Sequence, residues 1–190
     1  MSSKKIDYYN SGRIAEKVAA KAFEHLFNPV NDAMKAEARN VYNLVLKDAG
    51  VSKGQVVKLK EYGLIDLTSY CFIQFEIEGE DDFRFQLDSE EYEFIGARVN
   101  VPPELQEDLL LAYAPYQRVV KARNEFETRI SCDIRGKTVA GVLKQWPELR
   151  GFIEDQYGSQ GNAVLTTPFA DLIQKYISPL MALPSPDELK

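Results

Sequence analysis

The sequence is poor in the residues from which catalytic and metal sites are made. It has one histidine, His25, and two cysteines, Cys71 and Cys132, among 190 residues. The cysteines form no Cys-x-x-Cys pair, so we expect neither a zinc site nor a disulfide framework, and we interpret both as small buried apolar side chains. His25 has no oriented partner near it in the sequence, so we interpret it as a surface residue rather than a general base. The sequence therefore predicts no catalytic residue, no metal site and no cofactor.

Long apolar runs and glycine-rich phosphate loops are missing as well. No run is long enough to predict a transmembrane helix, and the first residues lack the apolar segment of a secretory signal. Neither Gly-x-Gly-x-x-Gly nor Gly-x-x-x-x-Gly-Lys-Ser/Thr occurs, so a nucleotide-binding loop has no support. Because two unrelated cysteines suit a reducing compartment, we expect a cytoplasmic protein.

The sequence does have an ordinary globular composition and an uneven distribution of charge. Hydrophobic residues make up 45% and charged residues 27%, so a core of useful size can be buried. The net charge is −6, and residues 76–93 alone contain nine acidic residues and one basic residue, a net charge of −8. The rest of the chain carries 22 basic and 20 acidic residues. The charge pattern therefore singles out one strongly acidic segment.

Two helices are expected in the first quarter of the chain. Apolar residues recur every three or four positions over 13–27, with Ser11 as the expected N-cap, and again over 30–48. Pro29 separates the two segments, because proline lacks the backbone donor that a continuous helix uses. Gly50 is expected to end the second helix, since glycine readily adopts the left-handed conformation found just after a helix.

A strand pattern follows the helices. Between residues 71 and 87 apolar and polar residues alternate, with a turn expected at Gly79 and the acidic residues after it. The apolar residues of both arms fall on one face, and acidic, basic and amide side chains fall on the other. This pattern predicts an antiparallel hairpin, and residues 92–99 are the candidate for a third strand.

The second half of the sequence reads as helical. A long helix is expected before Gly136, with Pro115 inside it as a predicted kink, and Thr138 is the expected N-cap of the next helix. The expected helices of this half span residues of about 101–135, 139–145 and 147–157.

These elements predict an α+β protein with N-terminal helices, a central antiparallel β-hairpin or three-stranded sheet, and a helical C-terminal half. Residues 1–157 are expected to form a single α+β domain, and the glycine-containing residues 158–166 a linker. Residues 167–190 are expected to form an appended amphipathic helix and tail. The apolar stripe of this helix includes Phe169, Leu172, Ile173 and Tyr176.

The acidic hairpin is the main candidate for a functional surface. Carboxylates that are close in sequence repel one another, and such a surface suits a basic partner, because charge steers the encounter and selects partners. The alternative is a solvated hairpin whose charges prevent edge-to-edge pairing with other sheets. The carboxylates expected to bind protein are those of Glu78, Glu80, Asp81, Asp82, Glu90, Glu91 and Glu93.

The last helix is the second candidate surface. Its apolar stripe packs either on its own domain or on another chain, and in the second case it is expected to make a homo-oligomer. Direct nucleic-acid binding is not expected, because the chain is acidic overall and contains no known reader motif. Membrane binding is not expected either.

One segment resembles a known family. Residues 138–148, Thr-Val-x-x-Val-Leu-x-x-Trp-Pro-Glu, are similar to a segment of small tailed-phage proteins of the nucleotide-modification-associated domain, fifth family. The alanine-rich residues 19–23 and the order of elements over about 5–155 are also similar. The resemblance implies a setting near phage DNA-base modification, but no established reaction and no catalytic residues. The chain departs from the family pattern after about residue 158.

The missing chemistry, the segregated charge and this resemblance together predict a non-enzymatic, phage-encoded accessory protein in the host cell cytoplasm. It is expected to bind a host macromolecule through the acidic hairpin, for example a host defence component or nucleic-acid enzyme that it inhibits. The alternative is a factor or enzyme in phage DNA base modification or nucleotide metabolism.

Overall fold

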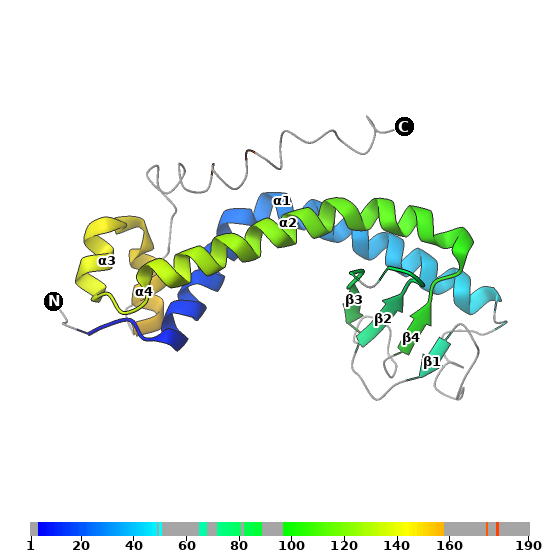
Figure 1. Ribbon diagram of the computed structural model, residues 1–190, viewed down its shortest axis with the longest axis horizontal. Helices are drawn as coiled ribbons and strands as arrows, with labels where there is room; N and C mark the ends of the chain where they lie inside the picture. Colours follow the sequence, from blue (N-terminus) through cyan, green and yellow to red (C-terminus); the bar gives the residue numbers. More distant parts are fainter. Residues whose placement is uncertain are drawn as a thin grey trace. The chain divides into compact units, whose positions relative to one another are not determined.

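The computed structural model describes residues 4–48, 50, 65–67, 72–80, 82–88, 97–157, 174 and 178, and for residues 65–67, 88 and 155–157 it describes the backbone alone. The described chain is an α+β protein, as the sequence predicts. A long N-terminal helix comes first, a small sheet follows, and helices make up the C-terminal half (Figure 1).

The chain divides into two compact units. The helical unit comprises Met1–Asn28 and Gln117–Lys190, and the sheet unit comprises Pro29–Tyr116. Two long helices, α1 (Tyr8–Asp48) and α2 (Pro103–Ile134), contribute residues to both units. The domain predicted over residues 1–157 thus includes parts of both.

The predicted linker lies outside the described residues, and of the predicted last helix only two residues are described. Gln174 and Ser178 are helical and exposed. The linker over 158–166 and the extent of the helix over 167–190 stay predictions.

α1 is one continuous helix of 41 residues, where the sequence predicts two. Pro29 lies inside it, so the break expected at this residue is wrong. A proline in a helix interior costs about 3 kcal/mol or more. The apolar stripe is buried on both sides of the proline, by Ile14 and Val18 before it and by Met34 and Val41 after it. This burial offsets the missing backbone hydrogen bond, so the helix continues.

The first helix also begins earlier than predicted, because Asp7 rather than Ser11 caps it. The Asp7 carboxylate accepts a hydrogen bond from the Asn10 backbone N–H at 2.8 Å and another from the Asn10 side-chain amide at 2.8 Å. Ser11 is buried within the helix, and its hydroxyl donates to the carbonyl of Tyr8 at 2.8 Å. At the other end, Gly50 has the predicted left-handed conformation, with a φ of +68°.

The sheet unit contains a four-stranded mixed sheet with the strand order β1-β4-β2-β3 (Figure 1). The strands are β1 (Ile65–Leu67), β2 (Phe72–Glu76), β3 (Gln86–Asp88) and β4 (Ala97–Asn100). β2 and β3 pair antiparallel, with Ile73 opposite Leu87, which confirms the predicted hairpin. β4 pairs antiparallel with β1 but parallel with β2, so the sheet has one strand more than the three predicted and is not wholly antiparallel.

The core of the sheet unit lies between one face of the sheet and residues 34–46 of α1 and 105–116 of α2. The side chains that alternate onto the predicted apolar face are buried there. Those most fully buried on the strands include Ile73, Phe75, Leu87 and Val99, each no more than 1% exposed. The alternation in the sequence therefore determines which face of each strand is buried. It does not determine the direction of the neighbouring strand, because both directions suit the same alternation.

The helical unit is completed by α3 (Val139–Gln145), η3 (Pro147–Leu149) and α4 (Arg150–Tyr157). The predicted cap of α3 is confirmed, since the Thr138 hydroxyl accepts a hydrogen bond from the Gly141 N–H at 3.1 Å. Pro147 begins the next helical segment as predicted, with its first three residues in a 3-10 turn. In the core, the rings of Phe23 and Phe126 lie 5.6 Å apart between centroids, and both side chains are fully buried.

Of the three scarce residues, the structure describes His25 and Cys132. Cys132 is exposed, so its interpretation as a buried side chain is wrong. Ile130 and Ile134 of the same helix face the core, and residue 132 lies about half a turn from each. His25 is exposed, as predicted, and Cys71 lies outside the described residues.

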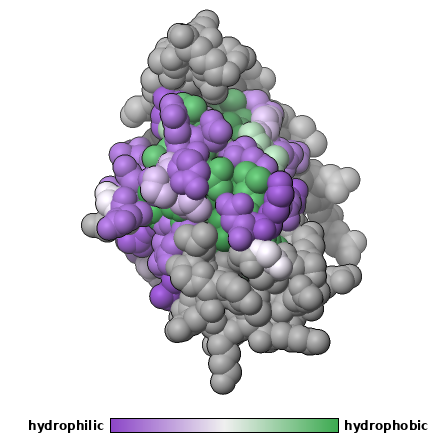
Figure 2. Space-filling model, turned by 90° about the vertical axis from the view of Figure 1, so that its right-hand side faces the viewer, coloured by the Kyte–Doolittle hydropathy of each residue, from purple (hydrophilic) through white to green (hydrophobic). Residues whose placement is uncertain are grey.

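On the face that Figure 2 shows, the described residues are mainly hydrophilic and surround a smaller hydrophobic area. Among the described residues, the large hydrophobic side chains that are exposed are those of Tyr8, Tyr9 and Leu111. None of the described helices is both long and apolar enough to cross a membrane.

Candidate functional site: an acidic groove

The candidate site is built on the chain segment that joins β2 and β3. The N–H of Glu80 closes a first tight turn at 3.1 Å, and the N–H of Phe83 closes a second at 3.0 Å. Gly79 has a φ of +85°, the value at the third position of a type II turn, where a residue with a Cβ would be strained. The strand alternation ends at these turns, and Glu78, Glu80 and Asp82 are all exposed there.

One side chain of α2 holds this segment in place. The hydroxyl of Tyr113 accepts a hydrogen bond from the Arg84 N–H at 3.0 Å and donates one to the Asp82 carbonyl at 3.1 Å. Its ring lies 4.5 Å from the ring of Phe83 between centroids, and the residue is only 8% exposed. A segment anchored in this way loses little conformational entropy when a ligand binds.

A groove of about 1250 Å³ lies beside this segment within the sheet unit. Charged, amide and aromatic residues line it. Its carboxylates are those of Glu76, Glu78 and Glu80, and its amides include Gln74, Gln86 and Gln106. The side chains of Phe83 and Tyr116, with two prolines and Arg84, also line it.

The three carboxylates of the groove differ in their electrostatic surroundings. Glu76 Oε1 lies 3.1 Å from Arg98 Nε, an ion pair without hydrogen-bond alignment, and accepts a 3.3 Å hydrogen bond from the Gln74 amide. Glu78 and Glu80 have no ion pair with any described residue. The negative charge that the groove presents to a ligand is therefore that of Glu78 and Glu80.

This arrangement offers a ligand charged, amide and aromatic groups. Two exposed carboxylates can hold the cationic groups of a ligand, the amides can pair with its backbone, and the aromatic rings can contact its apolar parts. Among the described residues, no group of three or more His, Cys, Asp or Glu side chains is placed to hold a metal ion. The two exposed carboxylates can therefore pair with cationic groups of a ligand.

The structure gathers three of the predicted binding residues and describes no others. Glu78, Glu80 and Asp82 lie close in sequence on one short segment and are exposed. The remaining predicted residues lie outside the described part of the chain: Asp81, Glu90, Glu91, Glu93, Phe169, Leu172, Ile173 and Tyr176.

Sequence reasoning missed one residue that holds the acidic segment and one buried carboxylate of the helical unit. Tyr113 falls on the inward stripe of its helix, which predicts burial, but no pattern predicts that its hydroxyl bonds the backbone of a hairpin about thirty residues away. Glu148 is only 7% exposed, and its Oε1 has no hydrogen-bond partner. Nothing in the composition around Glu148 predicts that its side chain is buried.

Set beside protein-family models, curated proteins and solved structures, the chain matches none of them.

Proposed function

We propose that the protein is a non-enzymatic accessory protein that holds a basic segment of a host macromolecule in the acidic groove of the sheet unit. The observation that supports this most is the pair of exposed carboxylates, Glu78 and Glu80, at a groove that also offers amides and aromatic rings. The anchoring of this segment by Tyr113 supports it further.

The charge of the whole sheet unit favours a basic partner. Residues 29–116 include 17 acidic and 8 basic residues, a net charge of −9. A field of this sign attracts cationic surfaces and speeds their encounter. The tailed-phage setting, in which the partner is a host defence component or another host enzyme, is part of the proposal and rests on the resemblance of residues 138–148.

A direct binding experiment tests the groove. The probe is a fluorescein-labelled decapeptide of alternating Arg and Thr, titrated with the full chain and followed by anisotropy. The variant Glu78→Gln/Glu80→Gln removes two exposed charges without touching the core. Its affinity for the probe should fall about tenfold, and the dependence on salt should become weaker.

A matched control distinguishes binding in the groove from attraction by the overall negative charge. Glu107→Gln/Asp108→Asn also removes two exposed carboxylates from the sheet unit, but neither residue lines the groove. This control should bind the probe with nearly unchanged affinity. Equal losses in both variants, or full binding by the groove variant, would contradict the proposal.

The natural partner can then be sought with the same pair of variants. Wild type, the groove variant and the control serve as baits in host cells, and the partner is the protein captured by the first and third but not by the second. A factor for phage DNA modification would behave differently, because its deletion would change the nucleoside composition of the phage DNA.

A further inference from the structure

The helical unit exposes two adjacent aromatic rings. Tyr8 is 75% exposed and Tyr9 is 67% exposed, on the first turn of α1. Aromatic side chains usually bury most of their large apolar area in a core or an interface. Two neighbouring exposed rings therefore indicate a candidate binding surface.

A cation lies over each of these rings. The guanidinium carbon of Arg135 is 5.4 Å from the ring centroid of Tyr8, and that of Arg13 is 5.4 Å from the ring centroid of Tyr9. Both distances are within the range of a cation–π contact. Neither arginine forms an ion pair with a carboxylate in the described part of the chain.

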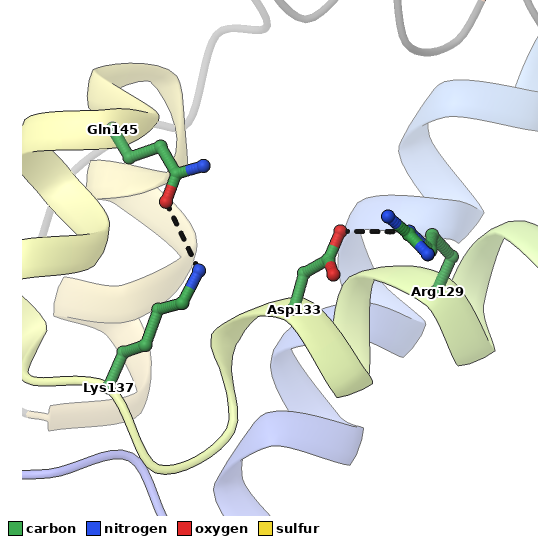
Figure 3. A network of polar contacts seen from close by, with 4 residues as sticks. All are labelled: Arg129, Asp133, Lys137 and Gln145. Carbon is green, nitrogen blue, oxygen red and sulfur yellow. Dashed lines mark hydrogen bonds and ion pairs between the residues drawn. The ribbon is translucent and has the colours of Figure 1, made fainter.

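A third pair of the same kind lies on the connection between α2 and α3. The ammonium group of Lys137 is 4.9 Å from the ring centroid of Trp146. It donates a 3.1 Å hydrogen bond to Gln145 Oε1, as Figure 3 shows. Because an amide carries no net charge, this contact positions the lysine without neutralising it.

Backbone hydrogen bonds join the N-terminal segment to the connection between α2 and α3. The N–H of Ile6 donates to the carbonyl of Lys137 at 2.9 Å, and the N–H of Gly136 donates to the carbonyl of Ile6 at 2.8 Å. Lys5 pairs with Thr138 in an isolated bridge. Tyr8 follows Ile6 by two residues, which is a chain length of about 7 Å at most. Lys5 and Tyr8 therefore lie beside the residues that flank Gly136.

The two chain segments that carry most of these groups are positively charged. Residues 4–13 and 129–144 contain seven basic and two acidic residues, a net charge of +5. Asp133 pairs with Arg129 at 3.0 Å, a contact also drawn in Figure 3, whereas Asp7 keeps its charge, because its hydrogen bonds go to the neutral Asn10. We name the exposed set the cation–aromatic surface; it consists of Lys5, Tyr8, Tyr9, Arg13, Arg135 and Lys137.

We propose that the cation–aromatic surface binds single-stranded nucleic acid. Lysine and arginine side chains match its phosphates, and tyrosine rings and guanidinium planes both stack on unpaired bases. A double helix would offer the phosphates but keep its bases stacked inside. An acidic protein would match the charge, but its carboxylates cannot stack on a tyrosine ring as an unpaired base can.

This proposal is independent of the acidic groove, since its residues all belong to the helical unit. It departs from the sequence-based expectation that the chain does not bind nucleic acid directly. That expectation came from the net charge of the whole chain and from the lack of a known reader motif, and the net charge hides a local surface of the opposite sign.

The test is fluorescence anisotropy of the full chain with labelled oligonucleotides of about 20 residues: oligo-dT, oligo-U and a DNA duplex of equal length. At about 50 mM salt, at least one single strand should bind with a dissociation constant in the micromolar range, and the duplex should bind at least tenfold more weakly. The comparison of the dT and U strands distinguishes DNA from RNA as the ligand. Log affinity should fall with log salt by a slope of about 0.7 for each phosphate contacted.

Five variants, two of them controls, locate the site. Tyr8→Ala and Tyr9→Ala should each weaken single-strand binding about tenfold by removing a stacking ring, while Tyr9→Phe should bind like wild type. Arg13→Gln/Arg135→Gln should lower the salt slope by one to two phosphate equivalents, about 0.7–1.4. Lys47→Gln, an exposed lysine in the sheet unit, is the control for a loss of positive charge and should leave the slope unchanged.

Several results would overturn the proposal. These are the absence of single-strand binding at low salt, equal binding of the duplex, and alanine variants of both tyrosines that bind like wild type. A further contrary result would come from light scattering. If wild type self-associates and Arg13→Gln/Arg135→Gln does not, then acidic residues of a second copy occupy the surface instead.

Discussion

The sheet unit and the helical unit carry net charges of opposite sign. The sheet unit has 17 acidic and 8 basic residues, and the helical unit has 12 acidic and 15 basic residues, so the net charges are −9 and +3. The total of −6 describes neither unit. A partner chosen by charge therefore meets two different surfaces on one chain.

The two surfaces also differ in how the chain builds them. The acidic groove takes its exposed charge from one short segment, with Glu78 and Glu80 only two residues apart. The cation–aromatic surface takes its charge from residues 4–13 and from residues about 120 positions later. A window along the sequence detects the first kind of surface and averages out the second.

The two units also differ in how many of their acidic residues form ion pairs. In the helical unit, three of the acidic residues pair with a base three or four positions away on the same helix: Lys21–Glu24, Arg129–Asp133 and Arg150–Glu154. In the sheet unit 8 bases cannot pair one to one with 17 acids. The excess of negative charge there is a standing cost in stability that a basic partner would relieve.

The largest expected effect concerns whether the two units unfold separately. Phe126→Ala removes a fully buried ring that packs on Phe23, and it should lower the free energy of unfolding by about 3–5 kcal/mol. Urea titration with fluorescence of Trp146, the single tryptophan and a residue of the helical unit, measures this loss.

The matched variant is Phe75→Ala, which empties a similar volume in the core of the sheet unit, where Phe75 is 1% exposed. It should move the Trp146 transition by less than half as much as Phe126→Ala. Equal shifts would break the comparison, because they would mean that both units unfold as one cooperative structure.

A smaller effect is expected from the clamp on the acidic segment. Tyr113→Phe leaves the Arg84 N–H and the Asp82 carbonyl without their partner and should cost about 1–2 kcal/mol of stability. The Arg84 amide should also exchange its hydrogen with solvent more rapidly. Tyr8→Phe removes the same hydroxyl from an exposed ring and should change stability by less than about 0.5 kcal/mol. An unchanged exchange rate at Arg84 would show that the clamp does not hold the segment.

The smallest effect is expected from an exposed pair in the helical unit. Lys21 donates a hydrogen bond to the Glu24 carboxylate, and this bond and the lysine charge lower the pKa of Glu24 below its ordinary 4.5. A lowered pKa means that the stabilising contribution is present above pH 4.5 and is lost as the pH falls through the pKa of the folded protein. Because the pair is exposed, the contribution is small and screened by salt.

Glu24→Gln should therefore reduce the urea midpoint slightly at pH 6 and not at pH 2.5. A carboxyl titration by NMR should place the pKa of Glu24 below 4.5 in wild type and closer to that value in Lys21→Met. Glu16→Gln on the same helix controls for the loss of an acidic residue. The same midpoint difference at both pH values would contradict the assigned cause.

Much of the fold follows from the sequence by itself. The helix boundaries near Pro103, Thr138 and Pro147, the buried faces of β2 and β3, and the turn at Gly79 all follow from local periodicity and from residues with restricted backbones. The exposed carboxylates of the acidic groove follow as well, because residues within one turn stay together in any fold.

The tertiary structure decided the rest. It carried α1 through Pro29, because the apolar stripes on both sides bury more than the missing hydrogen bond costs. It set β4 parallel to β2, which depends on the path of the chain between them and not on alternation. It joined Tyr113 to the hairpin backbone and Arg135 to Tyr8, contacts between residues far apart in sequence. Local sequence patterns reflect the backbone preferences and the periodicity of neighbouring residues. Contacts between distant segments form only after those segments have packed.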